Sequence, residues 1–157
     1  MSRVSIGIPA YNEANTLKNL VLENYAVLIK LKNKKILEDF EIFVLNDGSS
    51  DGTEKICFDL SIALAPYFRF ESNLRPSGQS SAFKQIYAFL KFEWHLLTPA
   101  DGQWNAVATE KILMSWKNSN YKSGVVSFRE NKSKLYNSKR KIISYIFNII
   151  GFIILTT

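Results

Sequence analysis

The sequence contains few of the residues on which several common kinds of site depend. It has one cysteine and one histidine in 157 residues. A single cysteine, Cys57, excludes an internal disulfide and a cysteine-based zinc site. It falls in an apolar helical pattern, so we expect a buried, unreactive thiol. The histidine, His95, lies within a strand pattern, which indicates a packed strand residue and argues against a Ser-His catalytic triad.

Several sequence motifs are also absent. The chain has no Gly-x-Gly-x-x-Gly and no Gly-Lys-Ser/Thr phosphate loop, so the usual dinucleotide and nucleoside-triphosphate sites are not expected. Gly-x-Ser-x-Gly is missing too. No apolar signal segment opens the chain, and we therefore expect a cytoplasmic protein. The apolar stretch 142–155 is about 14 residues long and interrupted by polar residues, whereas a membrane span needs roughly 20.

The composition is that of a single globular domain, 46% hydrophobic and 22% charged. Twenty basic residues against fourteen acidic ones give a net charge of +6, which suits an anionic partner such as a nucleotide, a lipid phosphate or a membrane surface. The basic residues gather at 132–141 and at 30–35, and we expect the second group to be a solvated loop. They lack an aromatic platform, so we expect no nucleic-acid partner.

Apolar runs alternate with apolar residues at helical spacing along the chain. The expected strands are 4–8, 40–45, 68–70, 94–97 and 124–128. The expected helices are 17–31, 56–64, 82–90 and 107–116, the first of them capped by Asn12 or Asn15. This alternation predicts an α/β fold with a mostly parallel sheet covered by helices on both faces.

Three polar turns directly follow expected strands: 9–13, 46–53 and 99–103. In a parallel sheet these turns share one edge, so they can converge on one ligand. In the third turn, Asp101 and Gln103 can direct two oxygens toward a cation or a diphosphate. The alternative is an ordinary strand-ending turn with an exposed Asp. In the second turn we interpret Asp47 as functional and Asp51 as structural, and either Asp51 or Thr53 can cap the next helix.

These motifs together resemble the family 2 glycosyltransferases of GT-A fold, and within them the polyprenyl- or dolichyl-phosphate sugar transferases. The residues that carry the resemblance are Pro9-Ala10-Tyr11-Asn12-Glu13, Asn46-Asp47-Gly48-Ser49-Ser50-Asp51-Gly52-Thr53, Asn73 with Gly78 and Ala82, Ala100-Asp101-Gly102-Gln103, Ser127-Phe128-Arg129, and Lys139-Arg140-Lys141-Ile142-Ile143-Ser144 with Asn148. Each motif is weak alone, but their order and spacing are specific. The resemblance runs over nearly the whole chain.

The resemblance implies transfer of a sugar from a nucleotide-sugar donor to a polyprenyl phosphate or a glycan, with inversion and with Mg²⁺ or Mn²⁺. Asp101 and Arg129 would serve catalysis, and Asp101 with Gln103 would bind the metal. The residues that would bind the nucleotide sugar are Pro9, Tyr11, Glu13, Asp47, Ala100 and Asp101. A lipid phosphate is already an anionic nucleophile and would need no strong general base, whereas a hydroxyl acceptor would.

Two departures from the family pattern lie in the turns. Pro99 stands where the family's metal motif has its first Asp, and Asn46 replaces the first of two acidic residues in the second turn. The family's later acceptor-site segments would follow Thr157, so the sequence suggests a truncated chain. A donor-binding remnant without catalytic activity is therefore the alternative function.

We expect a nucleotide-sugar-binding domain at 1–138 and a basic, apolar helix at 139–157. That helix suits either an anionic membrane surface on the cytoplasmic side or the core of a larger protein. In both cases it would expose apolar area and favour self-association.

Overall fold

The computed structural model describes residues 2–101 and 104–118. The predictions for Gln103, the strand 124–128, Arg129 and the C-terminal helix lie outside these residues. The chain divides into two compact units, Met1–Met114 and Ser115–Thr157, and the fold and site described below belong to the first. The elements are β1 (Arg3–Ala10), α1 (Leu17–Asn33), β2 (Asp39–Asn46), α2 (Thr53–Ala63), β3 (Phe68–Ser72), α3 (Gln79–Phe89), β4 (Trp94–Leu97) and α4 (Ala106–Asn118).

The described strands form one four-stranded sheet in the order β3-β2-β1-β4. All three pairings are parallel, with Ile6 opposite Ile42 between β1 and β2, and Gly7 opposite Leu97 between β1 and β4. The apolar runs of β1 and β2 are buried along almost their whole length, as expected for parallel strands covered on both faces. The α/β fold with a parallel sheet is confirmed.

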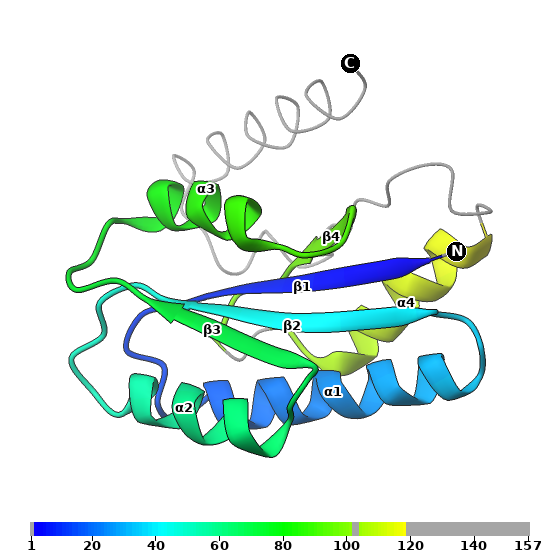
Figure 1. Cartoon of the computed structure of the whole chain (residues 1–157), viewed down its shortest axis with the longest axis horizontal. Coiled ribbons are helices and arrows are strands. Elements are labelled where there is room, and N and C mark those ends of the chain that lie inside the picture. The colour runs from blue at the N-terminus through cyan, green and yellow to red at the C-terminus, as the bar shows by residue number, and fades with distance from the viewer. Residues whose placement is uncertain (1, 102–103, 119–157) are drawn as a thin grey trace, which may run out of the picture. The chain divides into compact units, whose positions relative to one another are not determined.

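Helices cover both faces of this sheet. In Figure 1, α1 and α2 lie on one side and α3 lies on the other. Alternate strand residues point to opposite faces, so Phe43 and Leu45 of β2 pack on the α3 side against Ala82 and Ile86. None of the helices in the described part of the chain is long and apolar enough to cross a membrane.

Gly7 lets α3 lie close to the centre of the sheet. A Cβ atom at this position would come within 2.5 Å of Cγ2 of Ile86 and 2.8 Å of Cδ2 of Leu97. Any larger residue would have to displace the side chains of Ile86 and Leu97. The glycine in this otherwise apolar strand therefore has a packing reason.

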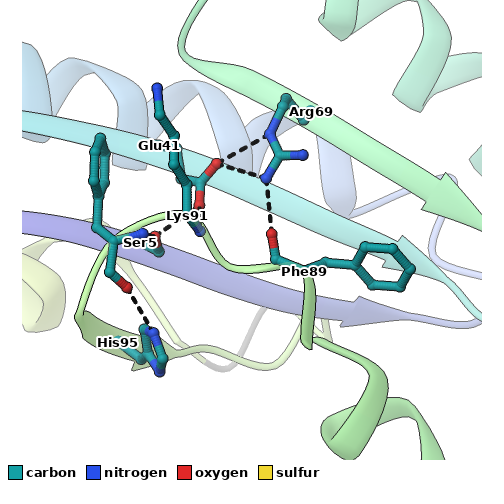
Figure 2. A network of polar contacts seen from close by, with 7 residues as sticks. Ser5, Glu41, Arg69, Phe89, Lys91 and His95 are labelled. Atoms are coloured by element: carbon teal, nitrogen blue, oxygen red, sulfur yellow. Dashed lines mark hydrogen bonds and ion pairs between the residues drawn. The ribbon is translucent and has the colours of Figure 1, made fainter. Parts of the chain in front are cut away.

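The buried carboxylate of Glu41 joins several elements near the amino ends of the strands, on the α3 side of the sheet (Figure 2). Glu41 of β2 accepts hydrogen bonds from the hydroxyl of Ser5 at 2.7 Å, from the guanidinium of Arg69 at 2.9 and 3.1 Å, and from the backbone N–H of Lys91. The hydroxyl of Ser5 also accepts from the backbone N–H of Phe92 at 2.9 Å. One side chain thus links three strands to the turn that leads from α3 into β4.

The structure corrects two expectations about the first helix. Neither Asn12 nor Asn15 caps α1, whose N-cap is Thr16 and has no side-chain capping hydrogen bond. Asn12 instead adopts a positive φ of 56° and belongs to the loop before the helix. The expected basic loop is also partly helical, since Lys30 and Lys32 lie in the last turn of α1, where positive charge favours the helix C-terminus.

His95 and Cys57 lie in the elements that were expected for them. His95 is in β4, but it is exposed rather than packed in the core, and its Nε2 lies 2.7 Å from the backbone oxygen of Phe92. Cys57 is fully buried in α2, and burial raises the pKa of its thiol to about 12. The expectation of a buried thiol is confirmed, and a thiol with this pKa is not a nucleophile at neutral pH.

Candidate active site

The carboxyl ends of the strands meet at one edge of the sheet, where the predicted site residues gather. The chain passes from β1 to β2 to β3 on one side of β1, and then crosses to β4 on the other. The strand order therefore reverses between β1 and β4. Open parallel sheets bind their ligands at such a reversal, outside the carboxyl ends of the strands. The loops that carry Tyr11 and Asp101 follow these two strands.

The loop after β1 is bound to the loop after β2 by the side chain of Asn12. Its Oδ1 accepts from the backbone N–H of Ser50 at 2.9 Å, and its own backbone N–H donates to Oγ of Ser49 at 3.0 Å. Asn tolerates the left-handed backbone that this arrangement requires. The expected convergence of these two turns is thus confirmed by direct contact.

Asp51 reinforces the same junction. Its Oδ1 accepts from the first N–H of α2, at Thr53, at 2.9 Å, and its Oδ2 accepts from the N–H of Ala14 at 3.1 Å. Oδ1 of Asp51 also accepts from the hydroxyl of Thr53. That hydrogen bond, followed by the two from backbone N–H groups, holds the pKa of Asp51 below its usual value. The structural interpretation of Asp51 is confirmed, because its carboxylate joins the loop after β1 to the start of α2. The expectation that Asp51 or Thr53 is the cap is wrong, since the N-cap residue of α2 is Gly52, without a side-chain capping hydrogen bond.

The three predicted donor-binding residues at the end of β1 differ in their exposure and in the hydrogen bonds that they already make within the protein. Tyr11 is 52% exposed at the edge, so its ring is accessible to a ligand. The carboxylate of Glu13 accepts from the hydroxyl of Thr16 at 2.6 Å, and its N–H donates to Oγ1 of Thr53 at 2.9 Å. Pro9 is the penultimate residue of β1 and is half-buried. Direct contact of these residues with a nucleotide stays a prediction.

Asp47 is buried and forms the centre of a third loop contact. Its Oδ1 accepts from Nδ2 of Asn73 at 2.7 Å and from the N–H and hydroxyl of Ser77 at 2.9 and 2.8 Å, while Oδ2 accepts from the N–H of Gly78 at 3.1 Å. Burial alone would raise the pKa of Asp47, but these hydrogen bonds outweigh it and lower the pKa below the usual value. Asp47 therefore holds the loop between β3 and α3 against the end of β2.

Gly48 allows this loop to approach. Its φ is +68°, and a Cβ there would lie 2.4 Å from the carbonyl carbon of Arg75 and 2.6 Å from the nitrogen of Pro76. Both the backbone conformation and the space exclude a side chain. The approach leaves Leu74 and Arg75 exposed at the edge of the sheet.

The loop after β4 carries Asp101. It begins at Thr98, whose backbone N–H donates to the carbonyl of Gly7 at 3.0 Å and so extends the β1–β4 pairing. Thr98 is 1% exposed, and its hydroxyl has no hydrogen-bond partner among the residues the structure describes. Ala100 is buried and Asp101 is exposed. The structure thus places Asp101 at the same edge as Tyr11 and Asp47, whereas Gln103 and Arg129 lie outside the described residues.

Two parts of this site were not predicted from the sequence. One is the contact of Asp47 with the loop between β3 and α3, although Asn73 and Gly78 of that loop are among the residues that carry the family resemblance. The other is a buried chain of hydrogen bonds from Asn24 through Thr109 to Trp104. Asn24 interrupts the buried apolar face of α1, and such a polar residue within an apolar stripe was a usable signal.

Comparison with solved structures identifies the class of fold. The S. aureus protein TarS, residues 1–349, superposes with a TM-score of 0.59 at 19% identity, over 88% of this chain and 40% of that one. The mannosyltransferase PcManGT from Pyrobaculum calidifontis, in complex with GDP-Man and Mn²⁺, superposes with a TM-score of 0.52 at 21% identity, over 62% of this chain and 27% of that one. The fold is that of the GT-A glycosyltransferases.

The sequence itself identifies the family. The profile of the glycosyl transferase family 2 matches residues 5–156, and the chain belongs to this family of enzymes. CsbB of Bacillus subtilis strain 168, whose name assigns it provisionally to the glycosyltransferases, is 34% identical over 100 residues. That match covers 64% of this chain and 29% of CsbB. The chain therefore spans less than half of the length of CsbB, and of the TarS and PcManGT chains with which it superposes.

Proposed function

We propose that this chain is the donor-binding domain of a glycosyltransferase that moves a sugar from a nucleoside-diphosphate sugar to a polyprenyl phosphate or a glycan, with inversion. The observation that carries the proposal is the convergence of the loops after β1, β2 and β4 at the edge where the strand order reverses. In support, TarS has been crystallised with UDP and with UDP-GlcNAc. We place the reaction in the cytoplasm, at the membrane face when the acceptor is a polyprenyl phosphate.

The donor would lie across this edge with its base toward the loop after β1 and its diphosphate toward the loop after β4. Tyr11 offers an exposed ring on which a base can stack. Asp47 would serve the donor through the loop that it holds, since its carboxylate already accepts four hydrogen bonds from that loop. Asp101, exposed in the loop after β4, would lie at the diphosphate.

A divalent cation fits this arrangement if the donor supplies most of its ligands. Within residues 2–101 and 104–118, no group of three or more His, Cys, Asp or Glu side chains could hold a metal. The carboxylates of Glu13, Asp47 and Asp51 at this edge are bound to the protein's own donors. Mg²⁺ commonly binds through one or two carboxylates together with substrate phosphates, and Asp101 with the diphosphate meets that pattern. Gln103 would add an amide oxygen.

The chemistry expected of such a site is mostly placement and charge. A bound Mg²⁺ or Mn²⁺ would supply positive charge against the diphosphate that leaves. Asp101 would orient the diphosphate, the loops after β1 and β2 would hold the nucleoside, and Arg129 would meet the phosphates or the acceptor. The anionic oxygen of a polyprenyl phosphate would attack the anomeric carbon from the opposite face, so that its bond to carbon forms and the bond to the diphosphate breaks. A glycan hydroxyl would in addition have to pass its proton to a general base.

Titration of the protein with UDP and GDP, with and without Mn²⁺, tests the donor site. We expect micromolar to millimolar binding that strengthens with Mn²⁺, and Asp101→Asn should abolish that strengthening. The substitution replaces an exposed carboxylate with an amide of nearly the same size, and thermal unfolding of the variant checks that the fold is kept. Asp59→Asn, at another exposed acidic residue in the middle of α2, is the matched control and should bind as the unaltered protein does. Equal Mn²⁺ dependence in both variants would contradict the assignment of Asp101.

Release of nucleoside diphosphate from UDP-GlcNAc or GDP-Man in the presence of Mn²⁺ and a polyprenyl phosphate tests the transfer itself. Turnover supports the transferase. Donor binding without turnover supports the donor-binding remnant that the sequence left as its alternative.

A further inference from the structure

A buried chain of hydrogen bonds connects the middle of α1 to the loop that carries Asp101. The hydroxyl of Thr109, in α4, donates to Oδ1 of Asn24 at 2.6 Å and accepts from Nε1 of Trp104 at 3.3 Å. The amide of Asn24 is oriented in turn by its Nδ2, which donates to the carbonyl of Leu20 at 2.8 Å. The indole N–H can only donate, so the single proton of the Thr109 hydroxyl must point to Asn24. Each donor in the chain has one fitting acceptor.

The two central residues lie where an apolar pair would ordinarily be found. Asn24 and Thr109 are both 0% exposed, and Asn24 occupies the buried stripe of α1 that also contains Leu20, Val21 and Leu28. Burying an amide and a hydroxyl costs free energy unless both are hydrogen-bonded. An apolar residue at position 24 would fit the helical pattern, so the polar pair indicates a role beyond filling the core.

The position of Trp104, at which this chain of hydrogen bonds ends, suggests that role. Trp104 follows Asp101 in the loop after β4 and precedes Asn105, whose Oδ1 accepts from the N–H of Ala108 in the first turn of α4 at 3.0 Å. At its other end the loop is joined to β1 through the N–H of Thr98. Asp101 thus lies on a segment whose two ends are both held by the core of the domain.

We propose that Asn24, Thr109 and Trp104 form a positioning network that sets the place of Asp101 toward the donor diphosphate and its cation. The inference rests on the proposed function. None of the three residues touches the reactants; they act by restricting the loop. Residues that orient a metal ligand in this way commonly affect metal affinity about 10- to 100-fold when they are removed.

The test compares three variants. Thr109→Val keeps the shape of the side chain but removes the hydroxyl, Thr109→Ser restores it, and Ser2→Ala removes a buried hydroxyl that donates to the carbonyl of Ile36 at 2.9 Å near the opposite edge of the sheet. We expect Thr109→Val to weaken Mn²⁺-dependent UDP or GDP binding about tenfold, with binding in the absence of Mn²⁺ changed less than about twofold. Thr109→Ser should recover most of the loss, and Ser2→Ala should lower stability without this effect.

Hydrogen exchange of the Trp104 indole N–H is a second measurement, and it tests the network without any bound nucleotide. Trp104→Phe removes the indole N–H, together with part of the ring, at a half-buried position. It identifies the Trp104 resonance among the three tryptophan indole N–H signals. In Thr109→Val the Trp104 indole hydrogen should exchange at least about tenfold faster than in Thr109→Ser, because its acceptor is lost.

The outcomes separate the inference from the proposed function. If the unaltered protein binds neither UDP nor GDP with Mn²⁺, the proposed function fails, and the indole exchange alone then tests whether the network holds the loop. If it binds and Thr109→Val binds equally well, or loses binding equally with and without Mn²⁺, the positioning role is overturned. A loss of Mn²⁺ dependence in Ser2→Ala as large as that in Thr109→Val would also overturn it.

Discussion

Glu41 and Arg69 form an ion pair at 2.9 Å in which one partner is buried and the other is not. The side chain of Glu41 is 3% exposed and that of Arg69 is 45% exposed. The pair joins β2 to β3, and Arg69 also donates to the carbonyl of Phe89 at 2.9 Å at the end of α3 (Figure 2). A buried carboxylate is stable only when donors surround it, and here they come from three parts of the chain, at Ser5, Arg69 and Lys91. The pair lies away from the candidate site and serves the fold.

Glu41→Ala should lower the free energy of unfolding by about 2–4 kcal/mol, because it leaves the donors of Ser5, Arg69 and Lys91 without their acceptor in the interior. Denaturant unfolding monitored by circular dichroism measures the change. The control is Lys55→Met, which breaks an exposed ion pair with Asp59 at 2.9 Å and should cost less than about 1 kcal/mol. A loss at Glu41 no larger than the loss at Lys55 would contradict the central role of the buried carboxylate.

Gly48→Ala should destabilise the protein by about 1–3 kcal/mol and weaken nucleotide binding, because the new Cβ would meet the backbone of Arg75 and Pro76 and φ is positive. Thermal unfolding and UDP titration measure the two effects. Gly52→Ala is the matched control in the same turn, since its Cβ would meet only the Cβ of Ala14 at 3.8 Å. We expect it to cost about 1 kcal/mol or less. Similar losses in the two variants would show that the loop between β3 and α3 is not held as described.

Asp47 should make stability depend on pH in the acid range. Its pKa in the folded protein lies below the ordinary 3.8, so the unfolded chain takes up a proton first as the pH falls. The stabilisation is therefore complete above the ordinary pKa and is lost as the pH falls through the lowered one. Between pH 6 and pH 3, Asp47→Asn should lose less stability than the unaltered protein does, because it lacks this proton uptake. Denaturant unfolding at several pH values measures the difference.

Identical pH slopes in Asp47→Asn and the unaltered protein would contradict this account of Asp47. Some acid sensitivity should remain in the variant, since the pKa values of Asp39 and Asp51 are lowered as well.

Much of the fold could be read from local patterns. The strand 94–97 was predicted with the observed bounds, and β1 and β2 were predicted slightly short. A buried strand is a continuous apolar run, and a parallel sheet brings the turns after such runs to one edge. The meeting of the turn at Asn12 with the turn at Asp51 followed from that rule alone. The family resemblance, which rests on the same turns, is confirmed over residues 5–156.

The sequence by itself determined the succession of strands and helices along the chain, the class of fold and the family. It also determined the edge of the sheet at which polar residues converge. These depend on periodicity and on residue types close together in the chain. Only the tertiary structure decided which partner each polar side chain has. Thr109 lies 85 positions from Asn24, and Glu41 lies 50 from the N–H of Lys91. Such pairs form only when strand order, register and helix packing are all set, because a hydrogen bond requires its two atoms within about 3 Å of each other.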